Sequence, residues 1–145
     1  MIWLLRHGEA EDLASDDASR RLTPKGERQS RAAGAALAAL GADIETCLTS
    51  PKARAEQTAR IACESLGIEV EVTDALRGGD FDAAEVAAGR GNCLLVGHEP
   101  DFSRAVALAT GARVDFKKGG IAAIDGATLK ALLRPDQIKR IAASA

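Results

Sequence analysis

The sequence predicts an α/β fold, a three-layer sandwich in which a mostly parallel β-sheet carries helices on both faces. Short apolar runs typical of buried strands alternate along the chain with longer segments whose apolar residues recur at helical spacing. Near the C-terminus, Asp125-Gly126 separates two apolar runs, and this dipeptide is typical of an antiparallel hairpin turn. The 145 residues show no repeat and no linker, so we expect one domain spanning residues 1–145.

The strands are predicted from apolar runs and from alternation. The run Ile2–Leu5 is continuous, as expected for a strand that is buried on both faces. Residues 68–72 alternate instead, with Ile68, Val70 and Val72 as the apolar positions. The predicted strands span residues 2–5, 44–49, 68–72, 93–96, 121–124 and 128–133.

The helices are predicted from their boundaries. Thr23-Pro24 and Ser50-Pro51 each join an N-capping residue to a proline, which suits the first helical position. Glycine follows three of the helical segments, where it favours helix termination. Gly78-Gly79 interrupts the chain, so only a short helix is expected beyond it. The predicted helices span residues 24–40, 51–66, 81–88, 100–110 and 135–143, and the polar segment 8–22 is expected to be a loop.

The composition excludes several classes of function. A net charge of −2 and a pI of about 5.7 indicate no global attraction to nucleic acid or to an anionic membrane. Three cysteines without a CxxC pair, and two distant histidines, exclude a disulfide framework, a structural zinc knuckle and a His-rich metal site. No stretch approaches the roughly 20 apolar residues of a membrane helix. We therefore expect a cytoplasmic, monomeric protein with reduced thiols and without a metal or other cofactor.

Three polar clusters each follow a predicted strand. They are Arg6-His7-Gly8, Ser50-Pro51-Lys52-Ala53-Arg54 and Gly97-His98-Glu99-Pro100. Because ligands bind outside the carboxyl ends of the strands in open α/β sheets, we expect the three clusters to meet in one crevice. They contain both histidines of the chain and two arginines that no acidic neighbour in the sequence neutralises.

These residue types suit phosphoryl transfer. Guanidinium groups match phosphate oxygens, and a helix start after Ser50 would add backbone N–H donors. An imidazole beside these cations is held neutral and nucleophilic at pH 7. A neutral imidazole aimed at a phosphorus atom that arginines hold is suited to covalent catalysis, and Mg²⁺ is not required in principle. The sequence has neither a Walker lysine loop nor an acidic triplet for magnesium.

The same clusters resemble the histidine phosphatase superfamily (branch 1), and within it the small SixA-type phosphohistidine phosphatases. The resemblance implies a phosphoglycerate mutase-like fold with one antiparallel strand. It also implies that His7 is the nucleophile and becomes a phosphohistidine, while Arg6, Arg54 and His98, with Gly8 beside them, bind the phosphoryl group and stabilise its transition state. The resemblance covers most of the chain and is carried by residues 4–10, 22–26, 50–59 and 96–100.

Each of these residues has a plainer explanation when it is taken alone. His98 could be a helix-start residue bonded to backbone, Arg54 a solvated helix arginine, and His7 a satisfied polar residue at a strand end. Only their coincidence after three predicted strands favours a site. The other polar residues and the cysteines are expected to have structural roles. Arg20 and Arg21 are expected to be surface charges, although a loop near the mouth could lend one of them to an anionic substrate.

The remaining singled-out residues are expected to be structural as well. Lys117-Lys118 is read as a solvated pair before the hairpin, and Trp3 as packing in the first strand. The three cysteines lie on predicted strands or a helix face and are expected to be core residues, namely Cys47, Cys63 and Cys93.

The general acid is not identified by any motif. Ester hydrolysis usually needs an acid for the leaving oxygen, and in larger members of the superfamily it lies before the second histidine. Here that segment, residues 73–92, is short, and the assignment stays open. The carboxylates considered are Asp74, Asp80, Asp82 and Glu85 within the segment, and Glu9 and Glu99 beside the histidine motifs.

The short segment also bears on the substrate. A phosphoramidate tolerates a poorly placed acid better than an alkyl phosphate does, and few lid elements leave a pocket open to a side chain of another protein. The first hypothesis is therefore a phosphatase acting on phosphohistidine in proteins. The second is a broad small-molecule phosphatase for phosphomonoesters or anhydrides, and the third is a non-enzymatic phosphate- or phosphopeptide-binding module. A mutase ranks below these.

Overall fold

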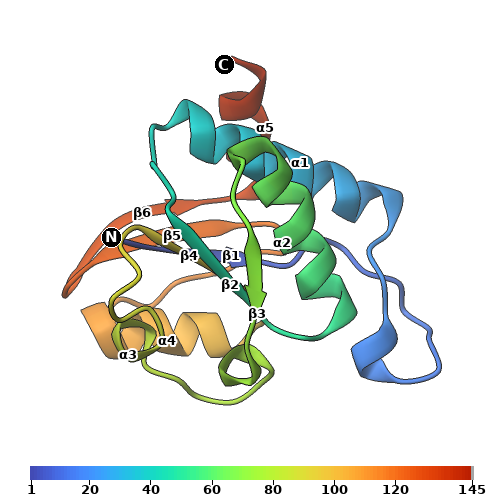
Figure 1. The fold of residues 1–145 in the computed structure, drawn as a ribbon, viewed down its shortest axis with the longest axis horizontal. Helices are drawn as coiled ribbons and strands as arrows, with labels where there is room; N and C mark the ends of the chain where they lie inside the picture. The colour runs from blue at the N-terminus through green and yellow to red at the C-terminus, as the bar shows by residue number, and fades with distance from the viewer. Residues whose placement is uncertain (145) are drawn as a thin grey trace.

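A six-stranded sheet forms the middle layer of the molecule (Figure 1). The computed structural model describes residues 1–144, and its strands lie in the order β3-β2-β4-β1-β5-β6. The first four pair in parallel, while β5 is antiparallel to both of its neighbours. The predicted mostly parallel sheet with one antiparallel strand is therefore confirmed. The strands are β1 (Ile2–Arg6), β2 (Thr46–Thr49), β3 (Val70–Val72), β4 (Cys93–Gly97), β5 (Ile121–Asp125) and β6 (Thr128–Leu133).

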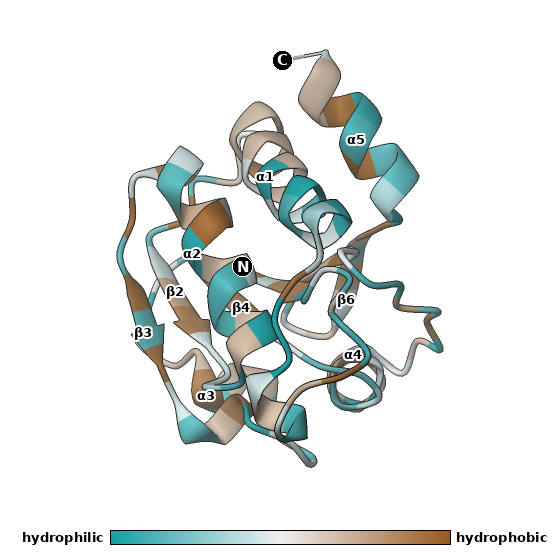
Figure 2. Cartoon of the chain, turned by 90° about the vertical axis from the view of Figure 1, so that its right-hand side faces the viewer, coloured by the Kyte–Doolittle hydropathy of each residue, from teal (hydrophilic) through white to brown (hydrophobic). Residues whose placement is uncertain are grey.

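Helices cover both faces of this sheet. In Figure 1, α1, α2 and α5 lie above the strands and α3 and α4 below them, and Figure 2 shows α1 and α5 side by side. The predicted three-layer sandwich is thus confirmed. None of the helices in residues 1–144 is both long and apolar enough to cross a membrane. The helices are α1 (Pro24–Ala39), α2 (Ala53–Leu66), α3 (Ala83–Val86), α4 (Asp101–Thr110) and α5 (Pro135–Ala143), with short 3-10 turns η1 (Asp17–Ser19) and η2 (Asp74–Leu76).

Alternate residues of the central strand β1 bury themselves in two separate cores. Trp3 and Leu5 pack in the cluster under α1 and α2, whereas Leu4 packs with Phe102 of α4 in the cluster on the other face. A fully buried leucine of this kind stabilises the fold by about 2 kcal/mol. The alternation explains why the run 2–5 is apolar throughout. The three cysteines and Trp3 are buried, as expected.

The register of the parallel strands aligns their carboxyl ends. Arg6 of β1 lies opposite Gly97 of β4, and Thr49 of β2 lies opposite Val96 of β4. The residue that follows each strand therefore leaves the sheet at the same edge. This alignment brings the three polar clusters of the sequence together.

Several boundaries differ from the sequence prediction. The strands β2 and β3 begin two residues later than expected, so that only the residues paired with a neighbour are extended. Ser50 does not cap α2: the helix begins at Ala53 with Lys52 as its N-cap residue, which makes no side-chain cap. Ser50 is instead held beside His98, and it accepts a hydrogen bond from the Lys52 backbone N–H. Thr23, in contrast, caps α1 as predicted by accepting from the Gly26 N–H.

Candidate active site

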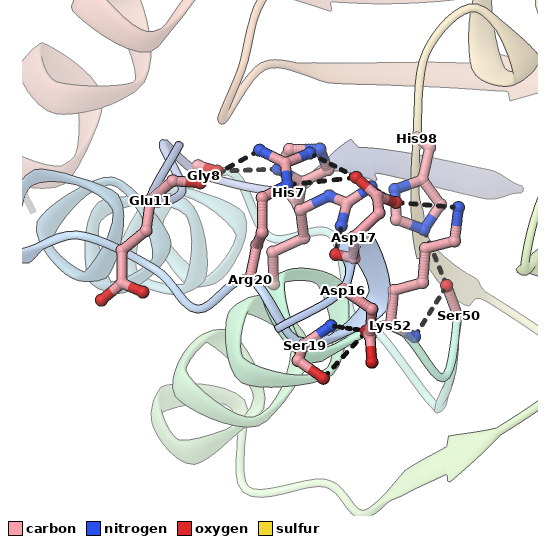
Figure 3. A network of polar contacts seen from close by, with 11 residues as sticks. His7, Gly8, Glu11, Asp16, Asp17, Ser19, Arg20, Ser50, Lys52 and His98 are labelled. Carbon is pink, nitrogen blue, oxygen red and sulfur yellow. Dashed lines mark hydrogen bonds and ion pairs between the residues drawn. The ribbon is translucent and has the colours of Figure 1, made fainter. Parts of the chain in front are cut away.

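The two histidines meet at the carboxyl edge of the sheet. The ring centroids of His7 and His98 are 5.3 Å apart, and both side chains are buried. Backbone hydrogen bonds extend the parallel ladder by one residue on each strand, because His7 N donates to Gly97 O and Ser50 N donates to Val96 O. The expected convergence of the three clusters is confirmed, and Figure 3 shows His7, His98, Ser50 and Lys52 around one space.

The tautomer of His7 follows from its hydrogen bond. The Nδ1 atom lies 2.7 Å from the carbonyl oxygen of Gly8. A carbonyl oxygen can only accept, so Nδ1 carries the hydrogen, and the neutral ring has its lone pair on Nε2. A neutral imidazole in this tautomer is the form that a nucleophile requires.

Two contacts fix the position of Gly8 and hence of His7. Gly8 N donates to Thr58 Oγ1 on α2, and that hydroxyl donates to the Arg54 carbonyl oxygen one turn earlier. On its other side, Gly8 lies against Gly26, where a Cβ on Gly8 would stand 2.6 Å from the Gly26 carbonyl oxygen. Glycine is therefore required by a close backbone approach. Thr58 is a positioning residue that the sequence patterns did not single out.

Burial keeps both imidazoles neutral. It lowers the pKa of His7 to about 4, opposed by the Gly8 carbonyl and assisted by the charges of Arg54, Arg6 and Lys118. The pKa of His98 falls to about 3, first through burial and then through His7, Arg54 and Lys52. The sequence-based expectation of a neutral imidazole attributed it to neighbouring cations, but desolvation is the larger cause. At pH 7 both rings are uncharged.

His98 has one ring nitrogen bonded and one free of protein partners. Its Nε2 shares a hydrogen bond of 2.7 Å with Ser50 Oγ, whereas its buried Nδ1 has no hydrogen-bond partner in residues 1–144. The Nε atoms of Arg6 and Arg54 are likewise buried and unpaired within the described chain. Such groups are rare in folded proteins and call for an explanation. A tetrahedral oxyanion, which offers acceptors in several directions, matches this set.

The other guanidinium nitrogens hold the arginines in place. Arg6 Nη1 donates to the Phe116 carbonyl oxygen at 2.8 Å, and Arg54 Nη1 donates to the Asp17 carbonyl oxygen at the same distance. Arg54 Nη2 also donates to the Asp17 carboxylate at 3.1 Å. Because the Arg54 side chain is only 6% exposed, its orientation is set by these bonds rather than by solvent.

Asp17 is a residue of the site that local sequence did not indicate. Its carboxylate contacts Arg54, Arg20 at 3.0 Å and Lys52 at 3.7 Å (Figure 3). No acidic neighbour in the sequence neutralises Arg54, but the fold supplies one, because η1 folds back onto α2 and brings Asp17 to Arg54 from 37 positions away. The hydrogen bond from Arg54 is the main cause that lowers the pKa of Asp17. An ionised carboxylate of this kind is a poor proton donor.

Arg20 also departs from its expected place as a surface charge. Its side chain is 27% exposed, and its guanidinium bonds Asp17 and the Glu11 carbonyl oxygen at the mouth of the site (Figure 3). The expected alternative, a loop arginine near the mouth, describes this position better. Arg21 remains exposed, as predicted.

The carboxylates considered as general acids are engaged elsewhere. Glu9 accepts from the Thr23 hydroxyl at 2.8 Å, and Glu99 accepts from the backbone and hydroxyl of Ser103 in α4. Among residues 1–144, none of the six has a hydrogen bond or ion pair with either histidine. In the short segment, Asp74 pairs with Arg77, Asp80 pairs with Arg104, Asp82 caps α3, and Glu85 is exposed.

The described chain also offers no cluster of metal ligands. Within residues 1–144, no group of three or more histidine, cysteine or carboxylate side chains is arranged to hold a metal ion. The structure therefore brings together His7, Gly8, Arg6, Arg54 and His98 from the sequence-predicted set, and in residues 1–144 none of the six carboxylates is bonded to these side chains.

Known proteins share both the sequence pattern and the fold. The pattern of the histidine phosphatase superfamily (branch 1) matches residues 2–91, more than half of the chain. An uncharacterized protein of Picosynechococcus sp. is 40% identical, over 83% of this chain and 81% of that protein. Two SixA structures are similar over nearly the whole chain. The protein histidine phosphatase SixA complexed with tungstate has a TM-score of 0.83 at 28% identity, and covers 95% of this chain and 99% of its own.

The second structure, of the SixA type and from Nakamurella multipartitia, has a TM-score of 0.77 at 29% identity, over 92% of this chain and 95% of its own. Its agreement extends the match beyond residue 91, through the strand and helix that hold His98. By sequence pattern and by fold, this chain belongs to branch 1 of the histidine phosphatase superfamily.

Proposed function

We propose that this protein removes phosphoryl groups from phosphohistidine in other proteins, through a covalent phosphohistidine intermediate on His7. The observation that carries the proposal is the pairing of a buried, neutral His7 with buried cationic donors. His7 has its lone pair on Nε2, and Arg54 and Arg6 lie near enough for their charges to act on its ring, each with a buried Nε–H that has no partner in residues 1–144. The similarity to a SixA protein that binds tungstate, a tetrahedral oxyanion, supports the same interpretation.

The first step forms a bond between His7 Nε2 and phosphorus. The P–N bond of the substrate breaks, its electron pair passes to the leaving imidazole, and that ring takes a proton from solvent. Arg6, Arg54 and His98 hold the equatorial oxygens, where charge is spread in the transition state. Donors that are already oriented, as Arg54 is by Asp17 and Arg6 by Phe116, need no reorganisation during the reaction.

The second step restores the enzyme. Water attacks the phosphorus of phospho-His7, the P–N bond breaks, and its electron pair returns to Nε2 as inorganic phosphate leaves. The hydrogen bond from Nδ1 to the Gly8 carbonyl stabilises the ring when it bears positive charge, because a carbonyl oxygen is an acceptor.

A phosphoramidate suits this site better than an alkyl ester. The carboxylates considered as acids have other partners or are exposed, and Asp17 is ionised. An alkoxide leaving group needs a proton donor at the site, whereas an imidazole takes its proton from water. Small phosphomonoesters and anhydrides remain the second hypothesis, which would require one of these carboxylates to turn toward the substrate.

The test compares two substrates and two arginine variants. We expect hydrolysis of a protein phosphorylated on histidine to be at least about 100-fold faster in kcat/KM than hydrolysis of a simple phosphomonoester. Rapid quenching with a ³²P-labelled donor should give an acid-labile, base-stable label on the wild type and none on His7→Ala. Arg54→Ala should lower turnover strongly, while Arg60→Ala, an exposed arginine of the same helix, serves as the matched control.

Three outcomes would contradict the proposal in different ways. Faster turnover of the ester would favour the small-molecule phosphatase. Full activity of His7→Ala would exclude a His7 intermediate. Tight phosphate binding with neither label nor turnover would favour the binding module.

A further inference from the structure

A second cationic feature lies beside the crevice. A groove of about 890 Å³ runs between α1, the segment 117–119 and the start of α5, the two helices that lie side by side in Figure 2. Its floor includes the apolar side chains of Ala32 and Ile138. We call it the basic groove, and its exposed cations are Lys25, Arg28, Lys117, Lys118, Arg134 and Lys139.

The charge of the basic groove contrasts with that of the whole chain. With Arg6 at its inner end, seven cationic residues line it, against the two carboxylates Glu9 and Asp136. The chain as a whole carries −2, so the remainder of the molecule is distinctly acidic. Lys25, Arg28, Lys118 and Lys139 form no ion pair in residues 1–144. Their mutual repulsion is therefore not relieved within the described fold.

The stability of the helices does not explain this arrangement. Lys25 and Arg28 lie near the N-terminal end of α1, and Arg134 is the N-cap residue of α5. The N-terminus of a helix carries a positive partial charge, so cations there are unfavourable and carboxylates favourable. The ion pair with Asp136 compensates Arg134, whereas Lys25 and Arg28 form no ion pair in residues 1–144. Residues that oppose local stability without compensation are expected where a partner is bound. The helix ends add their own positive potential to that of the side chains.

The basic groove is joined to the candidate active site by backbone. Gly119 N donates to the carbonyl oxygens of both Arg6 and His7. Lys118, the preceding residue, is one of the charges that lower the pKa of His7. Arg6 belongs to both regions, since it lines the groove and stands next to the proposed nucleophile. A chain lying in the groove would therefore contact Arg6, the residue that the groove shares with the crevice.

The occupant that these features fit is an acidic stretch of protein. Its carboxylates would meet the cations of the rim, and an apolar side chain would cover the partly exposed Ala32. A nucleic acid fits less well, because its continuous phosphate chain would extend from the bounded groove over an acidic surface. We propose that the basic groove docks an acidic segment of the phosphoprotein substrate, next to the phosphohistidine that enters the crevice. This inference rests on the proposed function and names how its substrate is recognised.

The binding test uses a fluorescently labelled peptide in which glutamate and leucine residues alternate. Its binding is measured by fluorescence anisotropy. The groove variant is Lys25→Glu/Arg28→Glu/Lys139→Glu, which spares Arg6 and Lys118. The matched control is Arg31→Glu/Arg113→Glu/Lys130→Glu, three exposed cations outside the groove, one of them on α1. We expect the groove variant to lose about tenfold or more in affinity, and the control to lose less than about twofold. Raising the salt from 50 to 500 mM should remove most of the wild-type affinity.

The activity test separates the groove from the chemistry. On a protein phosphorylated on histidine, kcat/KM of the groove variant should fall about tenfold, while on free phosphohistidine it should stay within about twofold of wild type. Loss on both substrates would place these cations in the chemistry and overturn docking. If no form of the enzyme hydrolyses phosphohistidine, the proposed function fails, and the peptide measurement still decides whether the groove binds acidic chains.

The melting temperature shows whether a loss of binding is caused by a loss of folding. Because Lys25 and Arg28 oppose the dipole of α1, the groove variant should melt at or above the wild-type temperature while its binding is lost. If the triple variant does not fold, Lys25→Glu and Arg28→Glu alone should each lower peptide affinity about threefold. Wild-type affinity for the acidic peptide in the groove variant, no binding by the wild type, or tighter binding of a single-stranded oligonucleotide than of the peptide would overturn the proposal.

Discussion

The crevice and the basic groove are both cationic, and they use charge in opposite ways. In the crevice, Arg54 is buried, bonded to Asp17 and fixed in one orientation. In the groove, the lysines are exposed and mostly without ion pairs in the described residues. Buried, oriented donors act over the length of one hydrogen bond, and salt weakens them little. Exposed charges act at longer range, and salt screens them. The first arrangement suits a transition state, and the second suits the capture of a partner.

The largest expected effect comes from removing the nucleophile. His7→Ala should lower kcat by about 10⁴-fold or more, because no other group can form the covalent intermediate without moving. His98 is the one remaining histidine, and its Nε2 is bonded to Ser50. Single-turnover kinetics on a phosphohistidine protein, with a melting curve to confirm folding, would measure the loss. A loss of tenfold or less in kcat would show that the crevice does not act through a His7 intermediate.

The next effect comes from the oriented donor. Arg54→Ala should lower kcat about 10²- to 10³-fold, since a preorganised donor to the transition state is lost. Arg60→Ala, on the exposed side of the same helix, should leave kcat within about twofold. The loss at Arg54 should be the same at 50 and 500 mM salt. A salt-dependent loss would mean that Arg54 behaves like a groove residue.

The buried histidines should make stability depend on pH. Their pKa values are about 4 and about 3 in the fold, against about 6.5 in the unfolded chain. Between these values the unfolded state binds more protons, so the free energy of unfolding falls as the pH drops from 6.5 towards 4. For His7 the shift corresponds to roughly 3 kcal/mol. Above pH 6.5 the contribution is fully present.

Urea unfolding at pH 7, 5.5 and 4.5 would measure this dependence. His7→Gln should remove a large part of it, and the groove variant should retain it, because lysine and arginine do not titrate in this range. If the free energy of unfolding of His7→Gln fell with pH as steeply as that of the wild type, His7 would be solvated, which would contradict its burial in the fold.

The smallest effect concerns Asp17, the one carboxylate that contacts the crevice cations in the described residues. Asp17→Asn should bind inorganic phosphate about fivefold more tightly by calorimetry, because an anion no longer competes for Arg54, Arg20 and Lys52. Asp16→Asn is the matched control. Asp16 is the neighbour of Asp17 and its side chain caps η1, which an asparagine oxygen can also do. Weaker phosphate binding in Asp17→Asn would mean that Asp17 chiefly orders Arg54.

The sequence predicted those parts of the molecule that local pattern controls. Apolar runs and capping residues report on the backbone within a few positions, so the alternation of strands and helices could be recognised from them. The crevice residues could be placed together because each follows a parallel strand, as His7 follows β1 and His98 follows β4. Here a short-range signal and a rule of topology were sufficient.

Contacts between distant side chains could not be predicted in this way. Asp17 reaches Arg54 only because the loop folds back, and Ser50 carries the pattern of a helix cap although it faces His98. The sequence predicts that Lys117 and Lys118 are solvated, and both are exposed. Their place in the groove depends on α1 and α5, which are distant in the sequence. No local pattern relates charges separated by about ninety residues.

The approach of Gly8 to Gly26 has a consequence for how specificity can change. A side chain on either glycine would strike main-chain atoms of the facing segment, so a substitution at one cannot be relieved by trimming the other. This close backbone contact thus locks the nucleophile loop against the start of α1. The neighbouring Lys25 and Arg28 take no part in this lock, and their side chains are exposed. We therefore expect partner choice to be re-engineered at these positions while the reactive centre keeps its shape.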